Sequence, residues 1–249
     1  MSRATLFRLV PALGLTQIIS WGALYYSIAV LGASIRDELG LSAAALFGAY
    51  SLSLLLSALT APLAGRAIDR YGGRLVMSVG SVTAALALFA IAHAHSAIAL
   101  YAAWALAGIA MAMTLYDAAF ATLSQHAGTS YRTALTALTL MGGLASTAFW
   151  LEWFGWRDTL SGFALLQIAI CLPLHLAFVP RTVTPIVPGR IGSEYEHGTL
   201  PPESRRPALI ALGVAFALNG FIVSALTVHL ITVLQGKGLP LESAVWVGA

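Results

Sequence analysis

The side chain with the most obvious capacity for chemistry is Asp117, the only carboxylate well inside one of the long apolar stretches of the sequence. A charge inside a membrane is costly, so an acidic residue there usually pairs with another charge or takes part in ion movement. Asp117 lies about one to two turns from the predicted end of its helix. We expect it to pair with Arg70 or Arg74; coupling to a proton or a cation, and exposure at a helix end, are the alternatives.

The histidines and hydroxyl side chains do not form a recognisable catalytic set. His93 and His95 make a His-x-His pair, but no carboxylate or cysteine is near them to complete a metal site. His175 and His229 fall near the ends of predicted spans. The general suitability of histidine for proton transfer is the only argument for that role there. No serine has a histidine partner at matching depth. We therefore expect neither an enzyme nor a metal or cofactor site.

The elements that must position these groups are membrane helices. The chain is 59% hydrophobic and 9% charged, whereas a soluble domain is about 25% charged. The apolar runs are long and continuous, as in helices, without the alternation of a membrane β-barrel. The single cysteine, Cys171, can form no intrachain disulfide, and we expect it to pack in the core. The sequence predicts an all-α membrane protein in a lipid bilayer, with no nucleic acid partner.

A span of about 20 apolar residues crosses a bilayer, which divides the chain into three predicted parts. Residues 1–179 form a six-helix transmembrane bundle, 180–206 a polar linker rich in proline, and 207–249 a partial second bundle with one complete helix and the start of another at Leu241. The predicted spans are 9–34, 43–64, 74–94, 97–122, 132–151, 159–179 and 207–235.

The basic residues predict the orientation of these spans. With a cytoplasmic N-terminus, ten of the thirteen basic residues lie inside and three lie outside, as the positive-inside rule requires. We therefore expect a cytoplasmic N-terminus and linker. The three outside are Arg36, Arg157 and Lys237; the ten inside are Arg3, Arg8, Arg66, Arg70, Arg74, Arg132, Arg181, Arg190, Arg205 and Arg206.

The densest group of charges is the decapeptide Gly65–Arg74, which we expect to be a tight loop between two helices. Because glycine has no side chain, Gly65 should allow two helices to approach closely. For the same reason Gly72 and Gly73 permit a reversal of the backbone. The alternative is that these charges only solvate a loop and fix the topology.

The same decapeptide is similar to the signature Gly-x-x-x-Asp-Arg-x-Gly-basic-basic of the major facilitator superfamily. Gly73 replaces the first of the two basic residues, while Gly65, Asp69, Arg70, Gly72 and Arg74 match. Phe154-Gly-Trp-Arg157 and Asp37-Glu-Leu-Gly-Leu-Ser42 are further marks of the resemblance. The resemblance implies a six-helix N-terminal bundle followed by helix 7 and the start of helix 8. It also implies that the matched residues, together with Asp117, form a cytoplasmic gate.

The resemblance further implies a central cavity bordered by helices 1 and 7. Candidate cavity residues are Gln17, Trp21, Tyr25 and Tyr26 on helix 1 and Asn219 on helix 7, with Trp21 and Asn219 nearest the bilayer midplane. Two other roles are open for these side chains, because Tyr and Trp anchor membrane interfaces and Asn and Gln bond neighbouring helices.

The implied function is secondary active transport of a small organic solute by alternating access, with the proton as a candidate coupling ion. Within the superfamily the chain looks most like bacterial members related to monocarboxylate and oxalate/formate carriers, which implies a place in the bacterial inner membrane. A carboxylate would need a basic residue in the cavity, and no complete span has one at mid-depth. The alternatives are a multidrug or metabolite efflux carrier, and a structural membrane protein without transport or an inactive fragment.

Members of the superfamily have about twelve helices, so we expect this chain to be a truncated copy; a complete protein that dimerises is the rival interpretation. Helix 5 has the pair Gly142-Gly143, which predicts close helix packing, but lacks the glycine and proline pattern of drug/proton antiporters.

Overall fold

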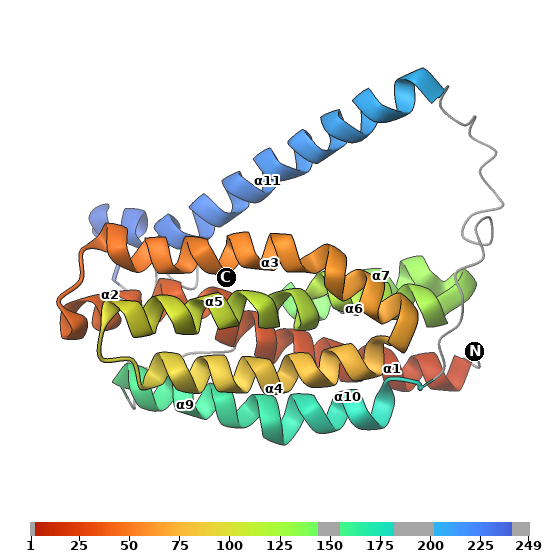
Figure 1. The fold of residues 1–249 in the computed structure, drawn as a ribbon, viewed down its shortest axis with the longest axis horizontal. Coiled ribbons are helices and arrows are strands. Elements are labelled where there is room, and N and C mark those ends of the chain that lie inside the picture. Colours follow the sequence, from red (N-terminus) through yellow and green to blue (C-terminus); the bar gives the residue numbers. More distant parts are fainter. Residues whose placement is uncertain (1–2, 144–154, 182–201, 241–249) are drawn as a thin grey trace. The chain divides into compact units, whose positions relative to one another are not determined.

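The computed structural model describes residues 3–143, 155–181 and 202–240, and every regular element in these ranges is a helix (Figure 1). This confirms the predicted all-α membrane fold class. The chain divides into two compact units, Met1–Val187 and Pro188–Ala249, which are described separately. The described helices of the first unit are α1 (Arg3–Ser20), η1 (Trp21–Tyr26), α2 (Ser27–Leu39), α3 (Ala43–Tyr71), α4 (Gly73–Ala92), α5 (Ala97–Thr114), α6 (Tyr116–Ala127), η2 (Gly128–Ser130), α7 (Tyr131–Gly143), α9 (Gly155–Leu166), η4 (Gln167–Cys171) and α10 (Leu172–Phe178).

Six stretches of the described residues are long and apolar enough to cross a membrane. The predicted span 132–151 is described only as far as Gly143, because residues 144–154 lie outside the described part of the chain. The six stretches are Leu6–Leu39, Ala43–Tyr71, Gly73–Ala92, Ala97–Ala127, Gly155–Phe178 and Glu203–Val223.

The first stretch is one continuous helix built from α1, η1 and α2, and it is longer than the predicted 9–34. It ends at Gly40, which has a left-handed backbone with φ 61° and donates its N–H to the Arg36 carbonyl. The next helix, α3, begins after Ser42, whose hydroxyl accepts a hydrogen bond from the Ala45 N–H at 3.1 Å. This is the usual way in which serine satisfies a free N–H at a helix start.

The charged decapeptide is mostly helical, which corrects the prediction of a loop over Gly65–Arg74. Helix α3 continues to Tyr71, and Gly72 alone separates it from α4. The φ angle of Gly72 is 85°, a value that glycine adopts without strain and other residues do not. Exposed charges such as Asp69 and Arg70 are compatible with a helix, so their presence marks the end of the apolar part and not the end of the helix.

The predicted span 97–122 contains a break that the sequence did not reveal. Helix α5 ends at Thr114, Leu115 is extended with φ −79° and ψ −168°, and α6 begins at Tyr116 and continues to Ala127. The last carbonyl groups of a helix have no partner within it. The break therefore places free backbone acceptors of α5 inside the bundle.

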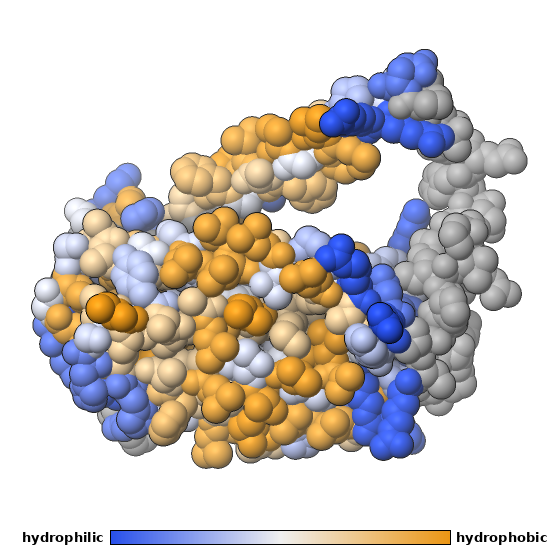
Figure 2. Space-filling view, in the orientation of Figure 1, coloured by the Kyte–Doolittle hydropathy of each residue, from blue (hydrophilic) through white to orange (hydrophobic). Residues whose placement is uncertain are grey.

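The helices of the first unit pack lengthwise. Helices α3, α5, α4 and α9 lie side by side in that order, and α1 packs against α7 and α10 (Figure 1). On this unit, Figure 2 shows hydrophobic side chains in a broad belt with hydrophilic side chains at its two ends, as a membrane-spanning bundle requires. We call the end with Gly72 the gate end and the end with Arg157 the opposite end.

The second unit contains helix α11 (Pro202–Gly236). It starts before the predicted 207–235, so the last residues of the predicted linker 180–206 belong to this helix. Residues 182–201 of the linker and the predicted start of a further helix at Leu241–Ala249 lie outside the described residues.

Candidate functional site

Three aromatic rings project from the middle of the first span. Trp21, Tyr25 and Tyr26 lie in η1, a π-helical segment with i→i+5 hydrogen bonds. In an α-helix residues 21 and 26 would lie about 140° apart around the axis, and the wider π turn reduces this angle. The ring centroids of Trp21 and Tyr25 are 4.9 Å apart and those of Tyr25 and Tyr26 are 5.3 Å apart. All three side chains are half-buried, so each keeps a face available for contact.

Neighbouring helices extend this group into what we call the aromatic cluster: Trp21, Tyr25, Tyr26, Tyr50, Tyr116 and Phe120. The Trp21 and Tyr116 centroids are 4.9 Å apart, and Tyr116 stacks on Phe120 at 5.0 Å. Tyr50 of α3 lies 6.1 Å from Tyr25 and donates its hydroxyl to the Tyr25 carbonyl at 3.2 Å. The cluster therefore joins the first, second and fourth predicted spans.

The side chain of Gln17 holds one ring of this cluster, that of Trp21, in position. Its side chain is fully buried; the Nε2 group donates to the carbonyl of Thr114 at 2.7 Å, and Oε1 accepts from the indole Nε1–H of Trp21 at 3.2 Å. One amide thus satisfies a free acceptor at the break after α5 and orients the Trp21 ring. Gln17 was predicted as a cavity residue, and the structure gives it this supporting position.

Tyr116 is held by α7 as well. Its hydroxyl donates to the Thr139 carbonyl at 3.1 Å, and a β-carbon at Gly142 would overlap the tyrosine ring. This confirms the close packing predicted for Gly142, whereas a β-carbon at Gly143 would meet no described atom within 4 Å. Tyr50 and Tyr116 were not predicted as site residues, because only the packing of different helices shows that they face Trp21 and Tyr25.

No fixed charge is buried in this region. The buried polar side chains of the described chain include Thr, Ser, Gln and His, but no Asp, Glu, Lys or Arg. Asp117 follows Tyr116 in the first turn of α6 and is exposed. The predicted ion pair of Asp117 with Arg70 or Arg74 does not form between these described residues. The break at Leu115 explains the difference, because it gives Asp117 the N-terminus of a new helix, where a negative charge is favourable.

The gate end brings the decapeptide against α6. Gln125 donates from Nε2 to the Ile68 carbonyl at 3.0 Å and to Oδ1 of Asp69 at 3.4 Å. A β-carbon at Gly73 would overlap the side chain of Thr122, so the missing side chain at this position permits close packing of α4 on α6. The close approach predicted at Gly65 is absent, because a β-carbon there would meet no described atom within 4 Å.

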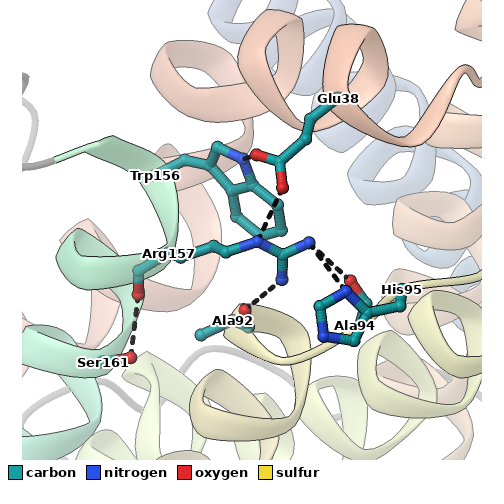
Figure 3. Close-up of polar contacts among 7 residues, drawn as sticks. All are labelled: Glu38, Ala92, Ala94, His95, Trp156, Arg157 and Ser161. Carbon is teal, nitrogen blue, oxygen red and sulfur yellow. Dashed lines mark hydrogen bonds and ion pairs between the residues drawn. The ribbon is translucent and has the colours of Figure 1, made fainter.

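At the opposite end, Arg157 in the first turn of α9 bonds residues at the ends of two other helices, α2 and α4 (Figure 3). Its Nε donates to Oε1 of Glu38 at 2.8 Å, and its two terminal nitrogens donate to the carbonyl oxygens of Ala92 at 2.5 Å and Ala94 at 3.0 Å. The indole of Trp156 donates to the other Glu38 oxygen at 2.5 Å. This arrangement fixes α2, α4 and α9 to one another at this end.

The remaining predictions have mixed outcomes. Cys171 is fully buried, as predicted for a packing residue. His175 lies in the last turn of the span Gly155–Phe178, near a span end as predicted, and it is buried between helices. Asn219 lies on α11 in the second unit, and its place at a cavity stays a prediction.

Comparison with known families now decides the class of protein. The profile of the Major Facilitator Superfamily matches residues 13–249, which is nearly the whole chain. The chain belongs to the Major Facilitator Superfamily. A search of curated proteins found no match.

Members of the Major Facilitator Superfamily are membrane transporters of small-molecule solutes and are not enzymes. Membership agrees with the apolar helices of the described chain and identifies the protein as a multi-pass membrane protein. The aromatic cluster lies on the first, second and fourth predicted spans of this bundle.

Proposed function

We propose that this protein moves a small organic solute across the bacterial inner membrane by alternating access, and that the aromatic cluster lines part of the route. The observation that carries the proposal is the set of half-buried rings Trp21, Tyr25 and Tyr26 around the π-helical segment. π-Helical bulges often occur at functional sites. Gln17 and the turn at Thr114 hold these rings in place before any solute binds.

The cluster supports one solute class better than another. A monocarboxylate or a related organic anion would need a positive partner, and the aromatic cluster contains no basic side chain. Its indole N–H and the hydroxyls of Tyr50 and Tyr116 already donate to protein acceptors. An organic cation or a flat aromatic compound gains directly from ring faces, by about 0.5–2 kcal/mol for each cation–π contact. The second candidate function, a multidrug or metabolite efflux carrier, is therefore the one that this cluster favours.

The charged side chains at the gate end support a further part of the proposal. Asp69 and Arg70 are exposed at the end of α3 and are free of ion pairs to described residues. We propose that Gly65, Asp69, Arg70, Gly72 and Arg74, with Asp117, belong to a cytoplasmic gate that opens and closes against the other half of a carrier. The N-terminus is cytoplasmic in this proposal.

A flux assay tests the function. Vesicles that contain the protein are loaded with unlabelled probe, and the entry of labelled tetraphenylphosphonium or labelled lactate is followed. We expect saturable entry of at least one probe, a loss of about tenfold in Trp21→Ala, corresponding to about 1.4 kcal/mol, and near-normal flux in Trp21→Phe, which keeps an aromatic ring. The absence of saturable flux and of binding for both probes would support a structural membrane protein.

A further inference from the structure

A buried histidine lies at the junction of three helices and has no part in the site described above. His175 of α10 is 1% exposed. Its Nδ1 lies 2.9 Å from Oγ of Ser81 on α4, and its Nε2 lies 3.2 Å from Oγ1 of Thr16 on α1. Both ring nitrogens therefore have a hydroxyl partner, and both partners are themselves buried.

The hydroxyls of Thr16 and Ser81 each have a backbone acceptor as well, at 2.9 Å and 3.2 Å, and the shorter bond of Thr16 assigns the donor. The Thr16 hydroxyl donates to the Leu13 carbonyl at 2.9 Å, so its oxygen accepts from the Nε2–H of His175. In neutral histidine one ring nitrogen donates and the other accepts. Nδ1 then accepts from the Ser81 hydroxyl, and every polar atom of the His175 ring is satisfied.

The same atoms satisfy a protonated ring. If Nδ1 gains a proton it becomes a donor, and Ser81 must present its oxygen instead of its hydrogen. The Met77 carbonyl lies 3.2 Å from Ser81 Oγ and accepts the hydroxyl hydrogen in that case. Rotation of one hydroxyl thus converts a network for neutral histidine into a network for the imidazolium ion.

We propose that His175 is a proton-binding site inside the bundle, with Ser81 and Thr16 as its partners, and that its protonation changes the environment of Trp21. The link is the first span: Thr16, which contacts His175, is followed directly by Gln17, which holds Trp21 and the Thr114 carbonyl. A positive charge on the His175 ring strengthens its hydrogen bond to the Thr16 oxygen and so changes the position of this turn of α1. A role of this proton in coupled transport rests on the proposed function; proton binding itself does not.

Few other ionisable groups face His175. It lies on α10, which packs against α1, α4 and η4. Cys171 of η4 is buried one turn earlier, and the nearest charged residues along α1 and α4 are Arg8 and Arg74, each about two turns from the histidine's partner toward the gate end. Asp117 is the acidic group next to the aromatic cluster, so a variant without this carboxylate is needed as a control.

The experiment is a pH titration of Trp21 fluorescence, from about pH 8 to about pH 3.5, which spans the usual range of histidine and carboxylate titration. The protein is held in lipid nanodiscs without any solute, and the Trp21 signal is the difference between the parent and Trp21→Phe. Variants are His175→Gln, Ser81→Ala, the exposed-histidine control His93→Gln and the carboxylate control Asp117→Asn. Circular dichroism confirms the helical fold at each pH.

We expect one transition in the parent, in His93→Gln and in Asp117→Asn, and its loss in His175→Gln. Ser81→Ala should move the midpoint to lower pH, because the imidazolium ion loses its acceptor and a charged hydrogen bond is the stronger one. A flat parent curve, or a transition that survives in His175→Gln, would overturn the proposal.

Histidine ¹⁵N spectra of the parent protein keep the test independent of the variants' folding. A buried ring that changes from one protonated nitrogen to two supports the proposal, and a ring that stays neutral while the protein remains folded overturns it. Neither readout needs transport. A normal titration without solute flux would refute the proposed function alone, and solute flux with a neutral His175 would refute this inference alone.

Discussion

The Nε2 group of Gln17 donates a hydrogen bond to the main-chain carbonyl of Thr114 at 2.7 Å, and this bond joins the first span to the break in the fourth. The same amide accepts the indole hydrogen of Trp21. Since the carbonyl belongs to the last residue of α5, it has no partner within that helix. A single side chain thus connects a backbone irregularity to the position of an aromatic ring.

Replacement of Gln17 by leucine should weaken the bundle. The variant leaves the Thr114 carbonyl without this donor, and a hydrogen bond between membrane helices contributes about 0.6–2 kcal/mol. We expect the free energy of unfolding to fall by about 1 kcal/mol, measured by unfolding in mixed micelles. Thr83→Val is the control, because the Thr83 hydroxyl bonds the Val79 carbonyl of its own helix. Equal stability of both variants would show that the interhelical bond has no net effect.

Gly73 should tolerate a side chain poorly, although the superfamily signature has a basic residue at this position. A β-carbon there would overlap Thr122, and overpacking of this kind costs about 1–3 kcal/mol. We expect Gly73→Ala to lower thermal stability clearly and Gly65→Ala to leave it nearly unchanged, since the space around Gly65 is open. Similar melting temperatures for the two variants would contradict the close packing of α4 on α6.

Arg157→Lys should loosen the opposite end of the bundle. Arginine bonds Glu38 and two backbone carbonyls at once, and the single ammonium of lysine cannot reproduce this planar set of donors. Hydrogen exchange of the amides at the C-terminus of α4 should become faster. Arg36→Lys is the matched control, because the partner of Arg36 is its exposed neighbour Asp37. Unchanged exchange in Arg157→Lys would mean that the three helix ends are fixed by apolar packing alone.

Orientation in the membrane can be read from two exposed positions. With Cys171→Ser as background, Tyr71→Cys marks the gate end and Asp158→Cys the opposite end; Tyr71 is 54% exposed and Asp158 is exposed too. In intact cells an impermeant maleimide should label Asp158→Cys and spare Tyr71→Cys, because the positive-inside rule places the arginine-rich end in the cytoplasm. The reverse pattern would contradict the cytoplasmic N-terminus.

The sequence predicted the helices well because apolar length is a strong signal, and it predicted the turn at Gly72 because only glycine suits that backbone. It did not predict the break at Leu115, because the residues around it, 109–122, contain no glycine or proline that would mark an interruption of the helix. Exposed charges led to a loop prediction where α3 continues to Tyr71, since a helix can extend beyond its apolar part.

For the candidate site, the resemblance to the superfamily pointed to Trp21, Tyr25 and Tyr26, because it implies that the first helix borders a cavity. Tyr50, Tyr116 and the burial of His175 depend on how different helices align in space. A single sequence contains no direct signal for which residues of two different helices face each other. Gln17 was singled out as polar, but only the broken end of α5 explains what it binds.

The proposed transport function depends most on contact between the solute and the aromatic cluster, and Trp21 reports on this contact directly. The measurement is the Trp21 fluorescence of the protein in nanodiscs, taken as the difference from Trp21→Phe, while tetraphenylphosphonium or lactate is added. We predict a saturable change for a probe that the protein also transports, with weaker affinity in Tyr116→Ala. Transport of a probe that leaves the Trp21 signal unchanged at every concentration would contradict the proposed solute route.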